Sequence, residues 1–254
     1  MSEGPLVIKF GGTSLETPAR IRRAARRVAA VVRGGRAVAV VVSARGRTTD
    51  RILRDLAALG AGSVPREVDR ALTTGEDLSA ALLAAALNAL GVPARSLRGG
   101  EAGVEAGGEF GGGVIRRVDS GRLAALLARG VVPVISGFQG ERDDRETVTL
   151  GRGGSDTSAV AIAVALAPAS CDIVTDVPAV FDRDPRRDPA ARPLPELTHD
   201  QLVALAASGA KVVHPDAARL AAAHRVPLRV YAYRAPLAGP RVATRVVERA
   251  EGAP

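Results

Sequence analysis

The sequence has few aromatic and sulfur-containing side chains. Its 254 residues include one cysteine, one methionine, two tyrosines, four phenylalanines and no tryptophan. A single cysteine excludes a disulfide scaffold, and we expect Cys171 to be a small buried apolar residue. The scarcity of rings argues against a single-strand nucleic-acid binder, because such proteins stack bases on aromatic side chains.

Long hydrophobic runs are also missing. The apolar run 159–167 is far shorter than the roughly 20 residues that span a bilayer. The N-terminal apolar run is interrupted by Lys9 and lacks the cationic segment of a signal peptide. We therefore expect a cytoplasmic protein without a membrane partner. The 46% hydrophobic and 24% charged content is typical of a globular chain.

Lysine is the next scarce residue. Of 35 basic residues, Lys9 and Lys211 are the only lysines, which leaves 33 arginines. An ammonium is a compact point charge whereas a guanidinium is a planar fork, so these two positions are candidates for phosphate contacts. The net charge of +8 leaves two interpretations of the arginine-rich segment 19–32. The first is a helix with a solvated basic face, which the spacing of its apolar residues favours. The second is a nucleic-acid-binding surface.

Strand and helix signals alternate along the chain, which predicts an α/β fold around a mainly parallel, buried sheet. We expect strands at 6–10, 37–43, 94–99, 131–137, 172–176 and 225–233. Helices are expected to begin at Pro18 and to cover 49–60, 76–90, 119–129, 157–167, 198–208 and 215–224. Segment 100–113 is a glycine-rich loop or hairpin, and 141–147 is a hairpin tip. We expect a single domain over 1–254, with two lobes that meet near residue 150.

Three glycine-rich turns follow predicted strands: KFGGTS (9–14), SARGRTTD (43–50) and GRGGSD (151–156). Converging backbone N–H groups and a following helix make each a candidate anion cradle. The sequence lacks both the GxxxxGK[ST] and the GxGxxG pattern, which disfavours a P-loop NTPase and a Rossmann dehydrogenase. The three histidines have no metal-ligand spacing, and we expect them to be structural or exposed: His199, His214 and His224.

Five motifs occur in a characteristic order: KFGGTS (9–14), TTGE (73–76), GRGGSD (151–156), TDVPAVFDRDPR (175–186) and GAKVVHP (209–215). Together they resemble the aspartate kinases of the amino acid kinase family, over residues 5–233. The resemblance implies a three-layer α/β/α sandwich, like that of carbamate kinase. It also implies an N-terminal lobe (1–150) that binds the amino acid and a C-terminal lobe (151–254) that binds ATP.

The resemblance also implies roles for individual residues. Lys9, with Gly11 and Gly12, would reach the transferring phosphoryl group, and Asp156 would orient this lysine. A helix N-cap at Asp156, before Thr157, is the structural alternative. The implied aspartate pocket comprises Ser43, Thr49, Glu76, Phe138, Arg152 and Ser155. The implied nucleotide site comprises Thr175, Asp176, Phe181, Arg186 and Lys211. Mg²⁺ is expected mainly through ATP, with few protein ligands.

The implied reaction is transfer of the ATP γ-phosphoryl group to the β-carboxylate of L-aspartate, the first step toward aspartate-family amino acids such as lysine and threonine. A homodimer through the kinase domain is implied as well. Family members usually continue into two ACT regulatory domains, whereas this sequence stops at Pro254. We therefore expect no feedback inhibition through such domains, unless a separate chain supplies it. The alternatives are a different amino acid or carboxylate as acceptor, and a non-catalytic nucleotide-binding protein.

Overall fold

An eight-stranded sheet lies at the centre of the computed structural model, which describes residues 4–60, 64–183, 188, 190–208, 213–237, 239 and 242–248. Neighbouring strands are parallel except for one antiparallel pair, β13 with β14. The strand order is β12 (Glu196–Thr198), β14 (Thr244–Val247), β13 (Leu228–Ala232), β9 (Ser170–Thr175), β1 (Leu6–Phe10), β2 (Val38–Val42), β6 (Val132–Ser136) and β3 (Ala94–Leu97).

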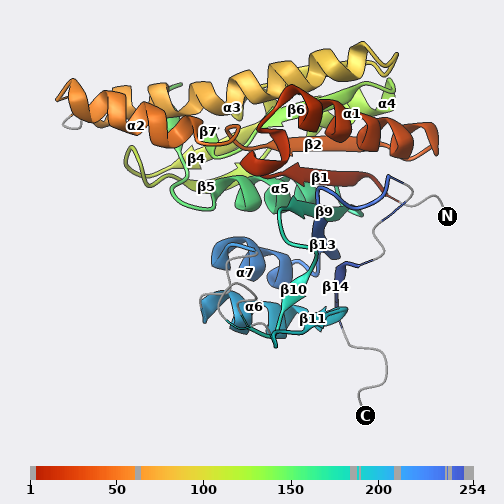
Figure 1. Cartoon of the computed structure of the whole chain (residues 1–254). Coiled ribbons are helices and arrows are strands. Elements are labelled where there is room, and N and C mark those ends of the chain that lie inside the picture. The colour runs from red at the N-terminus through yellow and green to blue at the C-terminus, as the bar shows by residue number, and fades with distance from the viewer. Residues whose placement is uncertain are drawn as a thin grey trace.

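Helices cover both faces of this sheet (Figure 1). One face is covered by α1 (Pro18–Arg33) and α3 (Pro65–Asn88), and α2 (Thr48–Ala58) packs on α3. The other face is covered by α4 (Gly121–Ala128), α5 (Gly154–Ala165), α6 (His199–Ala207) and α7 (Pro215–Ala223). The expected three-layer α/β/α sandwich is confirmed.

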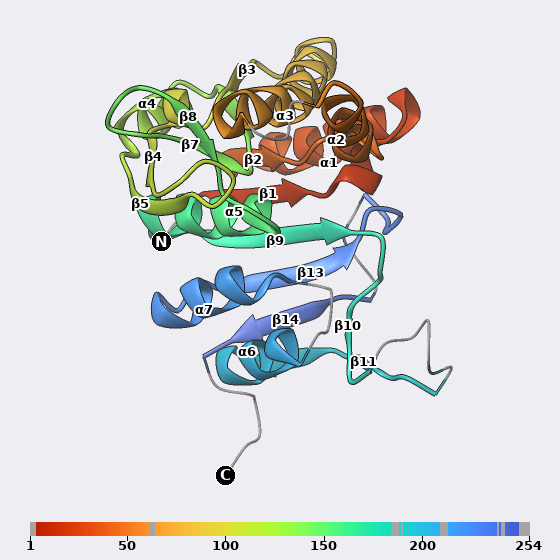
Figure 2. The same ribbon diagram turned by 90° about the vertical axis from the view of Figure 1, so that its left-hand side faces the viewer.

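The central strands come from distant parts of the sequence. Strand β1 pairs with β2 on one side and with β9 on the other, and β13 follows β9 (Figure 2). The sheet is therefore continuous across residue 150, where we expected the two lobes to meet. All five residues of β2 and of β6 are buried, as their unbroken apolar sequences predict for strands covered on both faces.

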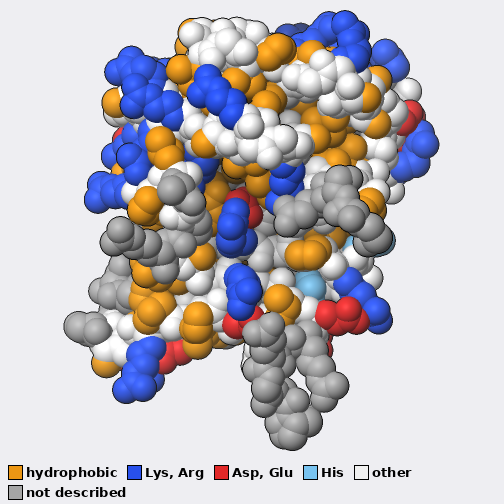
Figure 3. All heavy atoms as spheres, turned by 90° about the vertical axis from the view of Figure 1, so that its right-hand side faces the viewer, with side chains coloured by type: hydrophobic (Ala, Val, Ile, Leu, Met, Phe, Trp, Pro, Cys, Tyr) orange, Lys and Arg blue, Asp and Glu red, His pale blue; other side chains and the backbone are white. Residues whose placement is uncertain are grey.

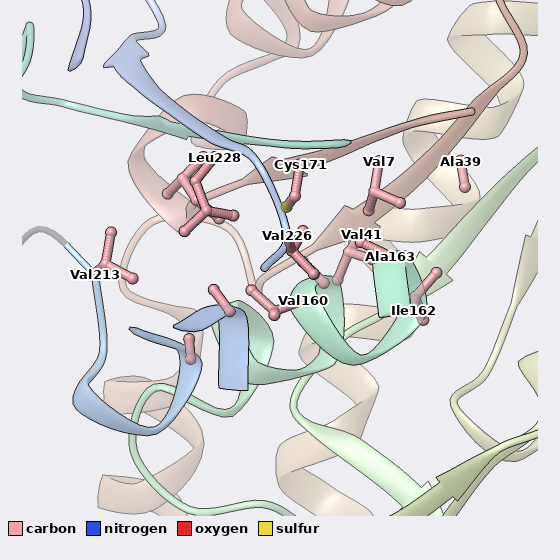
Figure 4. Packing of buried hydrophobic residues seen from close by; sticks show 14 of the residues in the cluster. Val7, Ala39, Val41, Val160, Ile162, Ala163, Cys171, Val213, Val226 and Leu228 are labelled. Carbon is pink, nitrogen blue, oxygen red and sulfur yellow. The ribbon is translucent and has the colours of Figure 1, made fainter. Parts of the chain in front are cut away.

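Side-chain alternation along β1 divides its residues between two hydrophobic cores. Leu6, Ile8 and Phe10 pack with α1 and α3, whereas Val7 packs with α5 on the opposite face. The second core also contains Cys171, which is fully buried as expected (Figure 4). Because successive side chains of a strand point to opposite faces, Lys9 shares the face of Val7 and points toward α5.

The arginine-rich helix α1 is only partly a solvated basic face. Arg27 is 4% exposed and donates to the carbonyls of Ala235 and Pro236. Arg23 donates to three carbonyls between 233 and 235. The solvated-face interpretation is therefore wrong for these two arginines, because they hold the segment after β13. Figure 3 shows the Lys and Arg side chains of one molecular face in separate groups, with hydrophobic and acidic side chains between them.

A second sheet carries the two hairpins. Its order is β5 (Val114–Val118), β4 (Val104–Gly107), β7 (Gln139–Glu141) and β8 (Thr147–Thr149). Strands β4 and β5 form an antiparallel pair within the glycine-rich region, after a 3-10 turn at Gly100–Ala102. Segment 141–147 is the expected tip between β7 and β8. A small third sheet pairs β10 (Val180–Phe181) with β11 (Pro193–Leu194).

Two expectations about the starts of helices are wrong. Helix α3 begins at Pro65 instead of 76, so the TTGE motif lies inside it. Helix α5 begins at Gly154 with Gly153 as its N-cap, which places Asp156 in the first turn and rules out the N-cap alternative for it. Strand β14 was not expected at all. Within the described residues, no helix has both the length and the hydropathy that a membrane span requires.

Candidate active site

A pocket of about 450 Å³ lies where the carboxyl ends of the central strands meet the helices. It brings together eight of the residues expected in the site: Lys9, Ser43, Thr49, Glu76, Phe138, Arg152, Ser155 and Asp156. A larger hollow of about 520 Å³ between β5, α5 and α7 is mostly apolar and contains none of them. Ligand sites in open α/β sheets form at this carboxyl end, so the polar pocket is the candidate active site.

Lys9 and Asp156 form an ion pair at the base of this pocket. The distance from Nζ to Oδ1 is 2.7 Å, and each side chain is 12% exposed. Oδ1 is buried, and among the described residues the Lys9 ammonium is its one polar contact. Oδ2 accepts the backbone N–H of His214 at 3.2 Å. One carboxylate oxygen therefore holds the start of α7, and the other can still accept a donor or a cation.

The glycine turns allow the loops around Lys9 to approach each other closely. A Cβ on Gly12 would lie 2.4 Å from the carbonyl oxygen of Ala44, so the turn after β1 abuts the turn after β2. Gly153 has φ +74°, and a Cβ there would overlap the ring of His214. Helix α5 begins directly after Gly153, so its positive dipole end lies at the pocket. These features suit the anion cradle that the sequence predicts.

Glu76 carries a second unpartnered carboxylate oxygen. The residue is 4% exposed, and its Oε1 accepts the backbone N–H of Ala44 at 2.9 Å, while Oε2 has no partner among the residues that the structure describes. Gly75 permits this contact, because a Cβ there would lie 2.8 Å from Cβ of Ala44. Burial raises the pKa of Glu76 to about 7. A buried carboxylate with a free oxygen is suited to bind a cationic group of a ligand.

Arg152 provides the opposite charge on the rim. Its side chain is exposed, it lines the pocket, and it makes no ion pair within the described part of the chain. Phe138 has φ +67°, an uncommon value for a non-glycine residue, and its backbone is fixed by Leu150 N–H and by the hydroxyl oxygen of Ser158. An acid, a guanidinium and several hydroxyls therefore face a single pocket beside the Lys9 ammonium.

A family model agrees with this geometry. The model described as "Amino acid kinase family" matches residues 4–232. The chain belongs to the amino acid kinase family.

Relatives within this family narrow the similarity. An aspartokinase of Geobacillus stearothermophilus is 44% identical over 227 residues, which is 89% of this chain and 56% of the relative. The chain thus spans little more than half the length of that protein. The crystal structure of aspartate kinase from Synechocystis superimposes with a TM-score of 0.82 at 40% identity, covering 96% of this chain and 40% of the other.

A third comparison involves a structure with ligands. E. coli aspartokinase III, crystallised in complex with aspartate and ADP, superimposes with a TM-score of 0.83 at 27% identity. The match covers 98% of this chain and 65% of that chain. The fold of this chain therefore matches one part of a longer aspartokinase chain.

The expected nucleotide residues of this family member are only partly described. Thr175 is the last residue of β9, the neighbour of β1, and Asp176 follows it; the Thr175 hydroxyl donates to Asp176 Oδ1 at 3.1 Å. Phe181 lies in β10 and is half-buried. These three are not among the described residues that line the pocket around Lys9. Arg186 and Lys211 lie outside the described residues, so their roles stay predictions.

Among the pocket residues that were missed in the sequence, three are joined by hydrogen bonds: Asp69, Gly111 and Thr149. Asp69 lies two turns before Glu76 on α3, and the two side chains share one face of the helix. Helical spacing could have found it, had the helix been started at Pro65. In the part of the chain that the structure describes, no three His, Cys, Asp or Glu side chains are grouped as a metal site.

Proposed function

We propose that this chain catalyses transfer of the γ-phosphoryl group of ATP to the β-carboxylate of L-aspartate. The observation that carries the proposal is one lysine and two buried acids in a single pocket: Lys9, its ion-pair partner Asp156, and Glu76, whose Oε2 has no partner within the described residues. The names of the relatives support it, since they are aspartokinases at 44% and 40% identity. Because the chain spans about half of such relatives, the whole activity remains a proposal.

The acceptor is held by its α-amino and α-carboxylate groups. Glu76 Oε2, which lacks a partner, accepts the ammonium, and Arg152 binds the carboxylate with its planar fork. Hydroxyls line the same pocket and bind the remaining polar atoms; they belong to Ser43, Thr49 and Ser155. Two fixed points orient an amino acid so that its side-chain carboxylate projects in one direction, and this orientation favours reaction.

The chemistry needs no general base, because a carboxylate with a pKa near ~4 is already ionised at neutral pH. The protein contributes position and positive charge. Lys9 stabilises charge on the transferring phosphoryl oxygens, and the Asp156 ion pair fixes its ammonium. The N-terminus of α5 adds backbone dipole at the same place. The C-terminal half, with Thr175, Asp176 and Phe181, binds the nucleotide in this proposal.

The residues present fit a magnesium ion that arrives with the nucleotide. Asp156 Oδ1 is a buried carboxylate oxygen whose one polar contact among the described residues is the Lys9 ammonium, and hard oxygen ligands are those that Mg²⁺ prefers. When bound, the ion would neutralise phosphate charge. Asp156 would hold it while keeping Lys9 in place. The expected homodimer and a separate regulatory chain stay predictions, which sedimentation of the purified protein and its co-purified partners can test.

The test is aspartate-dependent turnover. The purified chain is incubated with ATP, Mg²⁺ and hydroxylamine, and acyl hydroxamate and ADP are measured for L-aspartate, D-aspartate, L-glutamate and succinate. We expect product with L-aspartate and little with succinate, which lacks the ammonium that Glu76 binds. Equal rates with another acceptor would reassign the substrate. ADP release that no acceptor stimulates would refute the proposed transfer.

A further inference from the structure

Asp69 is a buried acid for which the proposed reaction has no use. Its side chain is 0% exposed, yet the residue lines the candidate active site from α3. Oδ1 accepts the Thr149 hydroxyl at 2.8 Å, and Oδ2 accepts the backbone N–H groups of Thr149 at 2.8 Å and of Gly111 at 2.9 Å. Within the described residues, all three donors are uncharged groups.

These bonds join three separate segments of the pocket wall. They connect helix α3 to strand β8 and to the loop 108–113 between β4 and β5. The same loop is held to β8 a second time, because Gly113 N–H donates to the carbonyl of Thr149 at 2.7 Å. From outside, the Arg142 guanidinium stacks 4.8 Å from the ring centre of Phe110. Asp69 therefore supplies the inner attachment of a loop that is held on both sides.

The loop reaches the segment that carries Arg152. The carbonyl oxygen of Gly111 lies 3.6 Å from the position of a Cβ on Gly151, so the two loops are in contact distance. Gly151 has φ +70° and directly precedes Arg152. Displacement of Gly111 would therefore change the space beside the residue that, in our proposal, binds the acceptor carboxylate.

The donor set uses both acceptor oxygens of the side chain at this position. A carboxylate only accepts hydrogen bonds, and three donors converge on Asp69. Asparagine has a single carbonyl oxygen in place of the two carboxylate oxygens, so at least one of the three donors loses its acceptor. Burying a carboxylate without a cationic partner costs free energy. If this position had only to stabilise the fold, an apolar side chain of similar volume would stabilise it more than Asp69 does.

We propose that Asp69 is a positioning residue that fixes loop 108–113 against Gly151 and thereby sets the end of the acceptor pocket. It determines acceptor affinity and the discrimination between aspartate and the longer glutamate, and it acts through Gly111 and Thr149. This inference deepens the proposed function and rests on it for its kinetic part.

The decisive comparison is between Asp69→Asn and Asp172→Asn. Asp172 is a matched control: it is 3% exposed and also accepts three hydrogen bonds, from Arg229 and Tyr231, away from the pocket. We expect Asp69→Asn to raise the KM for aspartate about tenfold or more, with kcat and the KM for ATP changed by less than about threefold. The preference for aspartate over glutamate should fall. Asp172→Asn should lower Tm and leave both KM values unchanged.

Thr149 provides a rescue test. Thr149→Val removes the hydroxyl that Asp69 accepts, whereas Thr149→Ser keeps it. The valine variant should reproduce the change in aspartate KM, and the serine variant should restore the wild-type value. If Asp69→Asn lowers Tm as Asp172→Asn does, with no change in aspartate KM or in acceptor preference, the positioning role is refuted.

Amide hydrogen exchange separates this inference from the proposed reaction, because it needs no substrate. Asp69→Leu, which offers no acceptor, should accelerate exchange at Gly111 and Thr149, whose N–H groups Asp69 accepts, while exchange in β9 stays as in the wild type. If the wild-type chain fails to phosphorylate aspartate, the proposed function fails. Hydrogen exchange alone then tests whether Asp69 holds loop 108–113. Unchanged exchange at the amides of Gly111 and Thr149 would show that it does not.

Discussion

Lys9 and Asp156 meet at 2.7 Å between Nζ and Oδ1, the lysine from the centre of the sheet and the acid from the first turn of α5. Lys9 lies between Val41 of β2 and Ile173 of β9 in the strand register, so its backbone is fixed on both sides. An ammonium held by one acid in a nearly enclosed position is preorganised, and preorganised charge stabilises a transition state better than a mobile side chain does.

Replacement of Lys9 should therefore affect the chemical step more than binding. We expect Lys9→Ala to lower kcat by about 10³-fold or more, with a change in nucleotide affinity of less than about tenfold. Lys9→Arg should also be severely impaired, because the planar guanidinium cannot replace a compact ammonium in this space. Hydroxamate formation and calorimetric nucleotide binding measure the two effects. Near-normal turnover in Lys9→Ala would contradict the role.

The sequence predicted six of the eight strands of the central sheet and the charged residues Lys9, Glu76, Arg152 and Asp156 of the pocket for definite reasons. Unbroken apolar runs identify β2 and β6, and two lysines among 35 basic residues identify Lys9 as unusual. The motif resemblance then supplied Glu76, Arg152 and Asp156, and the structure places all three in one pocket with Lys9. Motif order was sufficient for these three, although Glu76 lies inside α3 and Asp156 in the first turn of α5.

Other features could not be obtained in this way. Thr73, Thr74 and Gly75 are poor helix formers, so the sequence suggested a break where α3 continues. The helix persists because Gly75 lets it pack against Ala44, a contact between distant segments. Asp69 was missed for a similar reason, since its three donors come from segments 42 and 80 residues away in the sequence.

The two glycines after β1 should differ in their tolerance of alanine. Gly12→Ala places a Cβ 2.4 Å from the Ala44 carbonyl oxygen, so the turn must shift and Tm should fall. Gly11→Ala meets no atom closer than 3.6 Å and has φ −69°, so the fold should retain its Tm. The nearest atom to the added methyl is Lys9 Nζ, and kcat should therefore fall in Gly11→Ala. Thermal unfolding and turnover of both variants test this difference, and equal Tm losses would contradict it.

Glu76 should favour binding of the acceptor but lower the free energy of unfolding of the unliganded protein. Its pKa is raised from 4.5 to about 7, so its charged form is disfavoured in the folded state, and this cost grows as pH rises through that range. We expect Glu76→Gln to increase the free energy of unfolding by about 2–3 kcal/mol at pH 8, with a smaller gain at lower pH. The same variant should raise the KM for aspartate strongly. A loss of stability at pH 8 would contradict the assignment of a buried, unpaired acid.

The acceptor KM should depend on pH through the same residue. In the free protein the Glu76 pKa is about 7, and a bound ammonium favours the carboxylate and lowers it. Below that pH, binding must release a proton, so the KM for aspartate should rise about tenfold for each unit of falling pH and should be flat above it. Initial rates over a range of aspartate concentrations at several pH values measure this slope. Glu76→Gln is the control, because its weak binding should show no such slope. An aspartate KM that stays constant across this range in the wild type would show that Glu76 does not hold the ammonium.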